Sequence, residues 1–144
     1  MLRLLALFTF TVLTALTGGE WLVGWQNAAA RARAENKLIL ANFTGSDWCG
    51  WCIRLKSEVF DTAEFAAWAK EKVVPLVIDF PMRSPLPPAQ ARENEELQNR
   101  YRIQGYPTIV ILRPDGSEVG RLGYVRGGAA AWIAAAEKII GGAR

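Results

Sequence analysis

The 144-residue sequence contains no histidine, and this absence excludes several kinds of chemistry. Without imidazole groups the chain has no histidine general base, no Cys-His nucleophile pair and few of the usual ligands of zinc sites. Its formal net charge is only +3, and no long block of lysine and arginine is present, so we predict no nucleic-acid binding. We also expect no bound metal and no cofactor.

Cysteine is scarce as well: the chain has two, Cys49 and Cys52, spaced as Cys-x-x-Cys. They follow the apolar run 38–43 and precede residues 53–56, which have the composition of a helix. This order is typical of a redox-active dithiol, because unpaired N–H groups at a helix start favour a thiolate at Cys49. A purely structural disulfide is the alternative, but so short a loop supplies only roughly 2 kcal/mol. A metal-bridged dimer is a further alternative, since two thiolates fill half of a four-ligand site.

The apolar run at residues 4–16 is shorter than the roughly 20 residues that a spanning helix needs. Arg3 precedes it and small or polar residues follow, which is the order of a secretory signal peptide. We therefore predict a signal peptide over 1–19 and a folded domain over 20–144. The match to a small-x-small cleavage site at 15–17 is poor, so an uncleaved membrane anchor is the alternative. Export would place the protein in the periplasm or outside the cell, where disulfides persist.

Apolar periodicity predicts alternating helices and strands within one domain. Strands separated by helices are expected to pair in parallel, and a turn at 114–116 to join an antiparallel hairpin. The fold class is therefore α/β, a central mixed β-sheet flanked by α-helices on both faces. Helices are expected at 24–35, from the cysteines to about 59, from an Asp-x-x-Glu capping box at 61–64, at 89–102 and at 129–140, and strands at 38–43, 73–80, 109–112 and 118–124.

Two motifs in this order resemble the thioredoxin superfamily. Residues 48–52, Trp-Cys-Gly-Trp-Cys, stand where that family has its active-site Trp-Cys-x-x-Cys, and residues 105–108, Gly-Tyr-Pro-Thr, stand where it has its cis-proline loop. Gly123 resembles the family's glycine near the last strand, and the resemblance covers roughly 21–141. The amino-acid sequence of residues 43–52 is similar to that of exported bacterial thioredoxin-like proteins.

The resemblance implies a thioredoxin-like fold and a thiol-disulfide oxidoreductase. Cys49, at an exposed helix start, would attack a disulfide in a cysteine-containing protein substrate, and the more buried Cys52 would resolve the mixed disulfide. A separate redox partner would reduce or oxidise the pair. The protein is expected to act as a monomeric reductant or isomerase outside the cytoplasm, touching a membrane only through an uncleaved N-terminal segment. The implied substrate-binding residues are Trp48, Gly50, Trp51, Gly105, Tyr106 and Pro107, with a cis bond before the proline.

A binding module or chaperone without essential redox activity is the alternative function. The chain also departs from the thioredoxin pattern. Asn42 stands where the family has a buried acid that assists proton movement, and Pro75 where it has the companion lysine. These two replacements prevent the transfer of the family's proton relay. Trp51 replaces the proline of Cys-Gly-Pro-Cys, so the family's redox poise cannot be transferred either. The segment 81–96 is longer than its thioredoxin counterpart, and its proline-rich start at 81–88 is either a plain connection or a determinant of partner choice.

Asp47 permits two interpretations. Its carboxylate could cap the helix that follows, or it could raise the pKa of Cys49 by like-charge repulsion. We favour capping, by Ser46 or Asp47. Arg54 and Lys56 are expected to be solvated surface charges.

Overall fold

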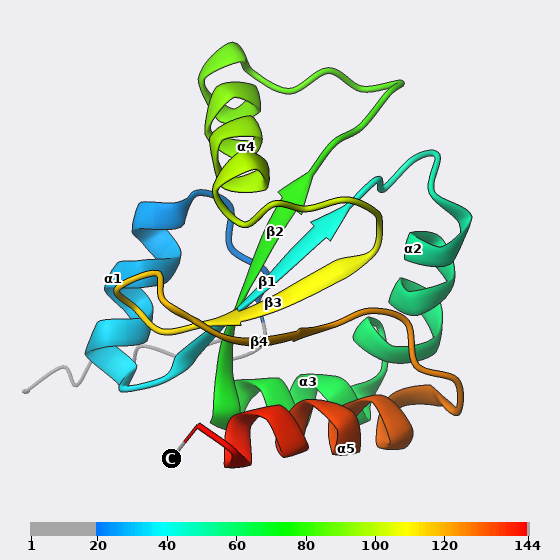
Figure 1. Cartoon of the computed structure of the whole chain (residues 1–144). Helices are drawn as coiled ribbons and strands as arrows, with labels where there is room; N and C mark the ends of the chain where they lie inside the picture. The colour runs from blue at the N-terminus through cyan, green and yellow to red at the C-terminus, as the bar shows by residue number, and fades with distance from the viewer. Residues whose placement is uncertain (1–19, 144) are drawn as a thin grey trace, which may run out of the picture.

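The computed structural model describes residues 20–143, so the predicted signal peptide lies outside the described residues (Figure 1). The elements follow one another in the predicted order, with boundaries shifted by a few residues. The helices are α1 (Trp25–Glu35), α2 (Gly50–Leu55), a π-helical turn η1 (Lys56–Phe60), α3 (Ala63–Lys72), α4 (Pro88–Arg100) and α5 (Gly128–Gly141), and the strands are β1 (Leu38–Thr44), β2 (Val73–Asp79), β3 (Thr108–Leu112) and β4 (Glu118–Leu122).

The four strands form one mixed sheet in the order β2-β1-β3-β4. β1 pairs in parallel with β2, whereas β3 is antiparallel to both β1 and β4. The prediction of parallel pairing for helix-separated strands is thus right for β1 and β2 and wrong for β1 and β3. Figure 1 shows the reason: after α4 the segment 101–107 returns the chain to the carboxyl end of β1, so β3 starts there, with Thr108 opposite Phe43.

Helices cover both faces of this sheet (Figure 1). Alternate residues of β1 point to opposite faces. Ile39, Ala41 and Phe43 belong to a core shared with α1 and α4, and Leu40 belongs to a second core with α2, η1, α3 and α5. Asn42 comes two positions after Leu40 and therefore lies on the same side of β1.

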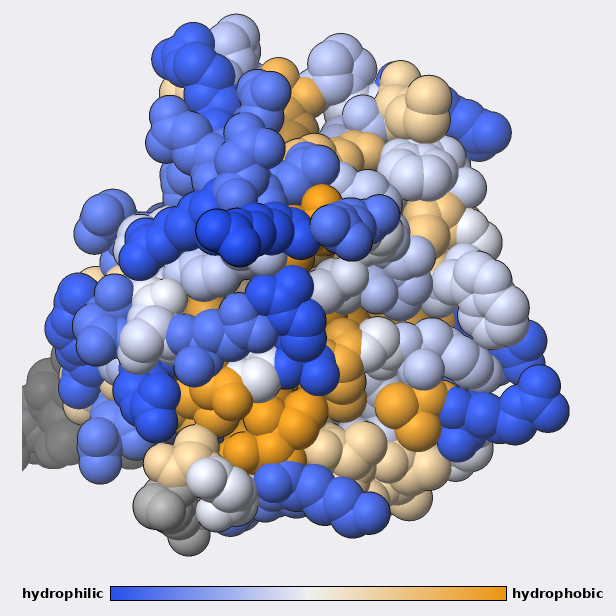
Figure 2. Space-filling model, in the orientation of Figure 1, coloured by the Kyte–Doolittle hydropathy of each residue, from blue (hydrophilic) through white to orange (hydrophobic). Residues whose placement is uncertain are grey.

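The second core is rich in aromatic rings. Trp132 of α5 is fully buried and makes edge contacts with Phe60, Phe65 and Trp68. In Figure 2 apolar residues gather between β4 and α5, whereas hydrophilic residues cover α4. The aromatic rings therefore fix the position of α3 and α5 beneath the helix that carries the cysteines.

The chain after the cysteines is less regular than predicted. The α-helix ends at Leu55, and a π-turn follows in which the Asp61 N–H donates to the Lys56 carbonyl oxygen at 2.8 Å. The predicted capping box is one residue out of register, because the side chain of Thr62, not Asp61, accepts the Phe65 N–H. The π-turn brings Lys56 beside Asp61, with 2.7 Å between the Nζ atom and each carboxylate oxygen.

No helix among residues 20–143 combines the length and the apolar character required to cross a membrane.

Candidate active site

The two cysteines form a disulfide at the start of α2, with their Cα atoms 5.2 Å apart. Cys49 is itself the N-cap of the helix: its backbone is extended, and its sulfur accepts the Cys52 N–H at 3.2 Å. The predicted capping by Ser46 or Asp47 is wrong, because a turn from Gly45 to Cys49 directs these two side chains away from the helix and towards the end of β2.

Both cysteines are largely covered. Cys52 is 4% exposed and Cys49 is 7% exposed, so Cys52 is the more buried of the two, as predicted, but the expectation of an exposed Cys49 is not met. The neighbouring indoles supply the accessible surface instead, since Trp48 is 43% exposed and Trp51 is 53% exposed. A partner approaching Cys49 therefore meets two aromatic rings first.

On one side, the cysteine segment is tied to the proline-rich loop after β2. The Asp47 carboxylate accepts the backbone N–H groups of Met82 and Arg83 at 2.9 and 2.7 Å. These hydrogen bonds to Met82 and Arg83 lower the pKa of Asp47. Ser46 donates through its N–H and its hydroxyl group to the carboxylate of Asp79, at 2.9 and 2.5 Å. The loop is therefore attached to the site, although it lies more than thirty residues away in sequence.

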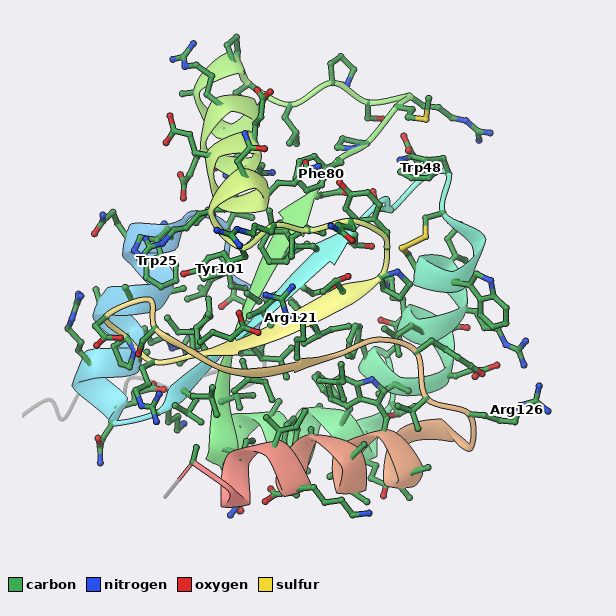
Figure 3. The ribbon with its side chains drawn as sticks, in the orientation of Figure 1. Trp25, Trp48, Phe80, Tyr101, Arg121 and Arg126 are labelled. Carbon is green, nitrogen blue, oxygen red and sulfur yellow. A yellow bond between two sulfur atoms is a disulfide. The ribbon has the colours of Figure 1, made fainter. Side chains whose placement is uncertain are left out.

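Aromatic side chains, including Trp48 and Phe80, lie on the same side of the cysteines as this loop (Figure 3). The Trp48 indole N–H donates to the Phe80 carbonyl oxygen at 2.8 Å, and the rings of Trp48 and Phe80 lie 5.8 and 5.4 Å from that of Tyr106. Gly45 makes room for the indole, because a Cβ at this position would lie 2.4 Å from Trp48. The Tyr106–Pro107 peptide bond is cis. Burial raises the pKa of the Tyr106 hydroxyl.

A second aromatic group forms around Trp51, which lies between the two cysteines in the sequence. The Trp51 ring lies 5.0 Å from that of Tyr124, and the Arg54 guanidinium group lies 5.5 and 5.4 Å from these two rings. Glu58 accepts hydrogen bonds from Tyr124 at 2.5 Å and Arg54 at 2.6 Å, and these bonds lower the pKa of Glu58. Arg54 is an exposed surface charge, as expected, with 51% of its side chain accessible, and it also contacts two rings and a carboxylate, which the sequence did not predict.

The remaining predicted site residues are accessible. No heavy atom lies within 4 Å of a Cβ placed at Gly50 or Gly105, so the backbone is open at both positions. The carbonyl oxygen of Pro107 lies 3.4 Å from the Cβ position of Gly123. Sequence reasoning missed the residues that support these groups from a distance. They are Gly45, Glu58, Asp79, Phe80 and Tyr124, and only Gly45 had a local signal, as a glycine beside the motif.

Asn42 is buried behind the disulfide. It is 8% exposed, and no donor among the described residues reaches its Oδ1 atom. A cavity of about 300 Å³ is lined by Asn42 together with Cys52, Lys56 and Asp61. Residues 20–143 contain no group of three or more carboxylate or cysteine ligands that could hold a metal ion. This cavity, whose lining also includes apolar side chains such as Trp21 and Phe60, is the second feature of the site, beside the dithiol.

Comparison with known proteins gives a consistent family match. The model of a thioredoxin-like domain matches residues 25–138. The sequence is 32% identical over 109 residues to the disulfide bond reductase DsbH of Chlamydia pneumoniae, covering 76% of this chain and 66% of that protein. It is 36% identical over 83 residues to protein disulfide-isomerase A3 of Gallus gallus, covering 58% of this chain and 13% of that protein. The chain thus spans just under two thirds of the length of the first relative and a small part of the second.

The solved structure of a DsbH oxidoreductase superposes with a TM-score of 0.80 at 30% identity, covering 84% of this chain and 83% of that one. The oxidised C-terminal domain of DsbD from Neisseria meningitidis superposes with a TM-score of 0.60 at 19% identity, covering 83% of this chain and 98% of that one, and supports the fold alone.

Proposed function

Because the chain belongs to the thioredoxin-like domain family, we propose that it is a thiol-disulfide oxidoreductase that reduces or isomerises disulfides in cysteine-containing proteins. One observation carries the proposal: the Cys49–Cys52 disulfide lies at the start of α2, with the Cys49 sulfur at the N-cap position. A sulfur placed there is stabilised as a thiolate by the Cys52 N–H and by the helix dipole. The thiolate is the form that attacks disulfides.

The reaction follows from the positions of the two sulfurs. In the reduced protein the Cys49 thiolate attacks one sulfur of a substrate disulfide, forms a mixed disulfide and releases the other substrate sulfur as a thiolate. Cys52, three residues further on and more buried, then attacks the Cys49 sulfur. The second substrate thiolate leaves, and the Cys49–Cys52 disulfide forms. Two electrons pass from the dithiol to the substrate in these steps.

The substrate is held by the surface around the dithiol. The exposed indoles offer apolar contacts, and the two open glycines allow another backbone to approach closely. Such a surface suits an extended peptide segment on either side of a cysteine. The proposed binding residues are Trp48, Gly50, Trp51, Gly105, Tyr106 and Pro107.

We extend the proposal to location and partner. The predicted signal peptide at 1–19 supports export to the periplasm or beyond, where substrates with disulfides persist. A reductant in such a place is consumed at each turnover, because Cys49–Cys52 becomes oxidised. A second protein must therefore return electrons to the pair, and the chain acts as a monomer between that protein and its substrates.

The main experiment compares two single-cysteine variants in an insulin-reduction assay. Cys49→Ser is expected to reduce insulin no faster than the uncatalysed reaction, because the nucleophile is lost. Cys52→Ser is the matched control: it keeps Cys49 and is expected to accumulate a covalent mixed disulfide with insulin, visible on a non-reducing gel. Full activity of Cys49→Ser would refute the proposed function.

The direction of electron flow has its own measurement, equilibration of Cys49 and Cys52 with glutathione. A reductant is expected to have a potential near thioredoxin's value of about −270 mV. A value near −120 mV, as in a strong oxidant, would overturn the reductant assignment while leaving the enzyme class intact.

A binding module is the second candidate, favoured by the exposed apolar side chains Trp48, Trp51 and Ile53 around the cysteines. This candidate requires that the double variant Cys49→Ser, Cys52→Ser retain biological activity. Complementation of a deletion strain by the double variant would support binding without redox chemistry, and failure of the variant to complement would exclude it.

A further inference from the structure

The oxygen of the Asn42 side chain is a buried acceptor without a donor among the described residues. Leaving such an atom unpaired costs on the order of 1–3 kcal/mol, so buried polar atoms are normally satisfied by protein groups or by ordered water. Asn42 lies near the carboxyl end of β1 and shares a face of the sheet with Leu40, whose core includes Leu55 of α2. An apolar side chain would fit that face, as Leu40 does two residues earlier.

The cavity beside Asn42 has room for the missing donor. Its volume is about 300 Å³. A water molecule takes about 30 Å³ in the liquid, so several can be accommodated. Asn42 and Cys52 line its inner part, and the exposed ion pair of Lys56 and Asp61 lines its outer part, with side chains 66% and 52% exposed. The cavity thus has polar groups both beside the inner sulfur and at its exposed ion pair, among apolar side chains such as Ile53 and Phe60.

The inner sulfur needs such a link under the proposed function. Before Cys52 can attack the mixed disulfide at Cys49, its thiol must lose a proton, because the thiolate is the nucleophile. Cys52 is only 4% exposed, and burial disfavours the charged thiolate. Bulk water does not reach this thiol directly, so its proton needs a path to an acceptor nearer the surface.

We propose that the cavity holds a chain of water molecules that carries the Cys52 proton to the Asp61 carboxylate. Asn42 is the positioning residue. Its Oδ1 accepts a hydrogen bond from the water molecule nearest Cys52, and this bond orients a lone pair of that water towards the thiol. Lys56 holds the Asp61 carboxylate at the mouth of the cavity, at 2.7 Å. This inference rests on the proposed function and names the proton route of its second step.

The step balances as follows. The S–H bond of Cys52 breaks, its proton passes through water to Asp61 and then to solvent, and its electron pair forms the S–S bond with Cys49. The bond between Cys49 and the substrate sulfur breaks, and that sulfur leaves as a thiolate. No oxidant other than the substrate disulfide is required.

The test separates the two attacks in time. The reduced protein is mixed in a stopped-flow instrument with a symmetrical aromatic disulfide whose thiolate product is coloured. The first coloured thiolate reports attack by Cys49, and the second reports attack by Cys52 on the mixed disulfide. Asp61→Asn is expected to slow the second phase by about tenfold and to leave the first phase within about twofold. The slowing is smaller than the roughly 100-fold or more of typical general-base catalysis, because water at the cavity mouth can still take the proton.

Rescue distinguishes proton transfer from a structural effect. Acetate added to Asp61→Asn is expected to restore the second phase in proportion to its concentration, because a free carboxylate can take the proton at the cavity mouth. Asp61→Glu is expected to keep most of the rate. Asp115→Asn, the same change in a distant turn, is the matched control and is expected to change neither phase. Asn42→Leu, which removes the acceptor inside the cavity, is expected to slow the second phase and to be insensitive to acetate.

The outcomes are distinguishable. If the wild-type protein shows no first phase, Cys49 is not a nucleophile and the proposed function fails. If both phases occur and the Asp61 and Asn42 variants match the wild type, only the proton route fails. A slow second phase in Asp61→Asn without acetate rescue, or an equal slowing of both phases, also overturns the route.

Discussion

Two buried asparagines, one on each face of the sheet, are treated in opposite ways. Asn94 of α4 is 3% exposed; its amide N–H donates to the Asp79 carbonyl oxygen, and its Oδ1 accepts from Gln90, both at 2.8 Å. Asn42 of β1 is 8% exposed, and its Oδ1 has no donor among residues 20–143. Asn94 therefore uses both its amide oxygen and its amide nitrogen in hydrogen bonds, whereas the amide oxygen of Asn42 has no partner in this part of the chain.

The two asparagines differ in hydrogen bonding because they have different neighbours. Asn94 fixes the end of β2, and the carboxylate of Asp79 at that end holds Ser46 before the cysteines. Asn94 thus supports the site through a closed set of hydrogen bonds. Asn42 faces a cavity shared with Cys52, where an open acceptor can bind water. A buried asparagine therefore positions the loop before the cysteines on one face of the sheet, and on the other face it provides an acceptor beside Cys52.

The comparison predicts a large loss of stability on the Asn94 side. Asn94→Leu leaves the Asp79 carbonyl oxygen without its donor, and should lower the free energy of unfolding by about 1–3 kcal/mol. Denaturation in urea, followed by tryptophan fluorescence, measures the change. Asn99→Leu, the same substitution at an exposed position of the same helix, is the control and should change stability by no more than about 0.5 kcal/mol.

A loss at Asn94 no larger than at Asn99 would break the comparison, since the paired amide would then contribute nothing that leucine cannot replace.

Asp47 tests whether hydrogen bonds to a side chain that is not buried also stabilise the site. It accepts two backbone N–H groups, from Met82 and Arg83, but is partly exposed. Asp47→Ala should therefore speed hydrogen exchange at these two amides by about fivefold, the effect of a typical hydrogen bond, with little change in global unfolding. NMR exchange rates measure it, with the amide of Ser117, which donates to Asp115, as an internal control.

The same pair has a pH dependence of known sign. The two backbone hydrogen bonds lower the folded-state pKa of Asp47 below its unfolded value of about 3.9. Their stabilisation is fully present above that value and is lost as the pH falls through the lower folded-state pKa. The Met82 and Arg83 amide shifts should therefore move together at acid pH in the wild type. Unchanged shifts through that range would show that the Asp47 carboxylate does not hold the loop.

Local patterns in the sequence were enough to predict most of the fold. The apolar run of β1 predicted burial on both faces, and this is confirmed from Ile39 to Thr44. The order of helices and strands is also confirmed, because apolar periodicity is a local property. The direction of β3 was wrong, since it depends on the path of residues 101–107 across the sheet, which no local pattern encodes.

The site was predictable where a motif is contiguous and not where it is assembled. The cysteines and their flanking tryptophans share one segment, so their proximity follows from sequence. Asp47 was assigned to the wrong partner because its true partners lie about thirty-five residues away. The exposure of Arg54 was predicted, but its contact with Tyr124 was not, because that ring lies seventy residues further along the chain. The burial of Asn42 was foreseen from its strand, but the cavity beside it depends on how η1 packs.

The smallest expected effect is the sharpest test of the comparison. Asn42→Leu removes an acceptor that no described protein group uses and adds an apolar side chain to an apolar face, so the free energy of unfolding should change by no more than about 0.5 kcal/mol. The urea midpoint measures this beside Asn94→Leu. The stopped-flow second phase should slow in the same Asn42 variant, while Asn94→Leu, if it folds, should lose stability without a selective effect on that phase.

A loss at Asn42 as large as that at Asn94 would mean that the Asn42 amide makes structural hydrogen bonds after all, and the contrast between the two faces would disappear. Unchanged stability together with a slower second phase can arise only if the open acceptor works in the reaction and not in the fold. Leucine keeps the branched shape of asparagine, and the cavity of about 300 Å³ beside residue 42 has room for its larger methyl groups. The pair of measurements therefore decides whether the unpaired oxygen is retained for the chemistry of Cys52.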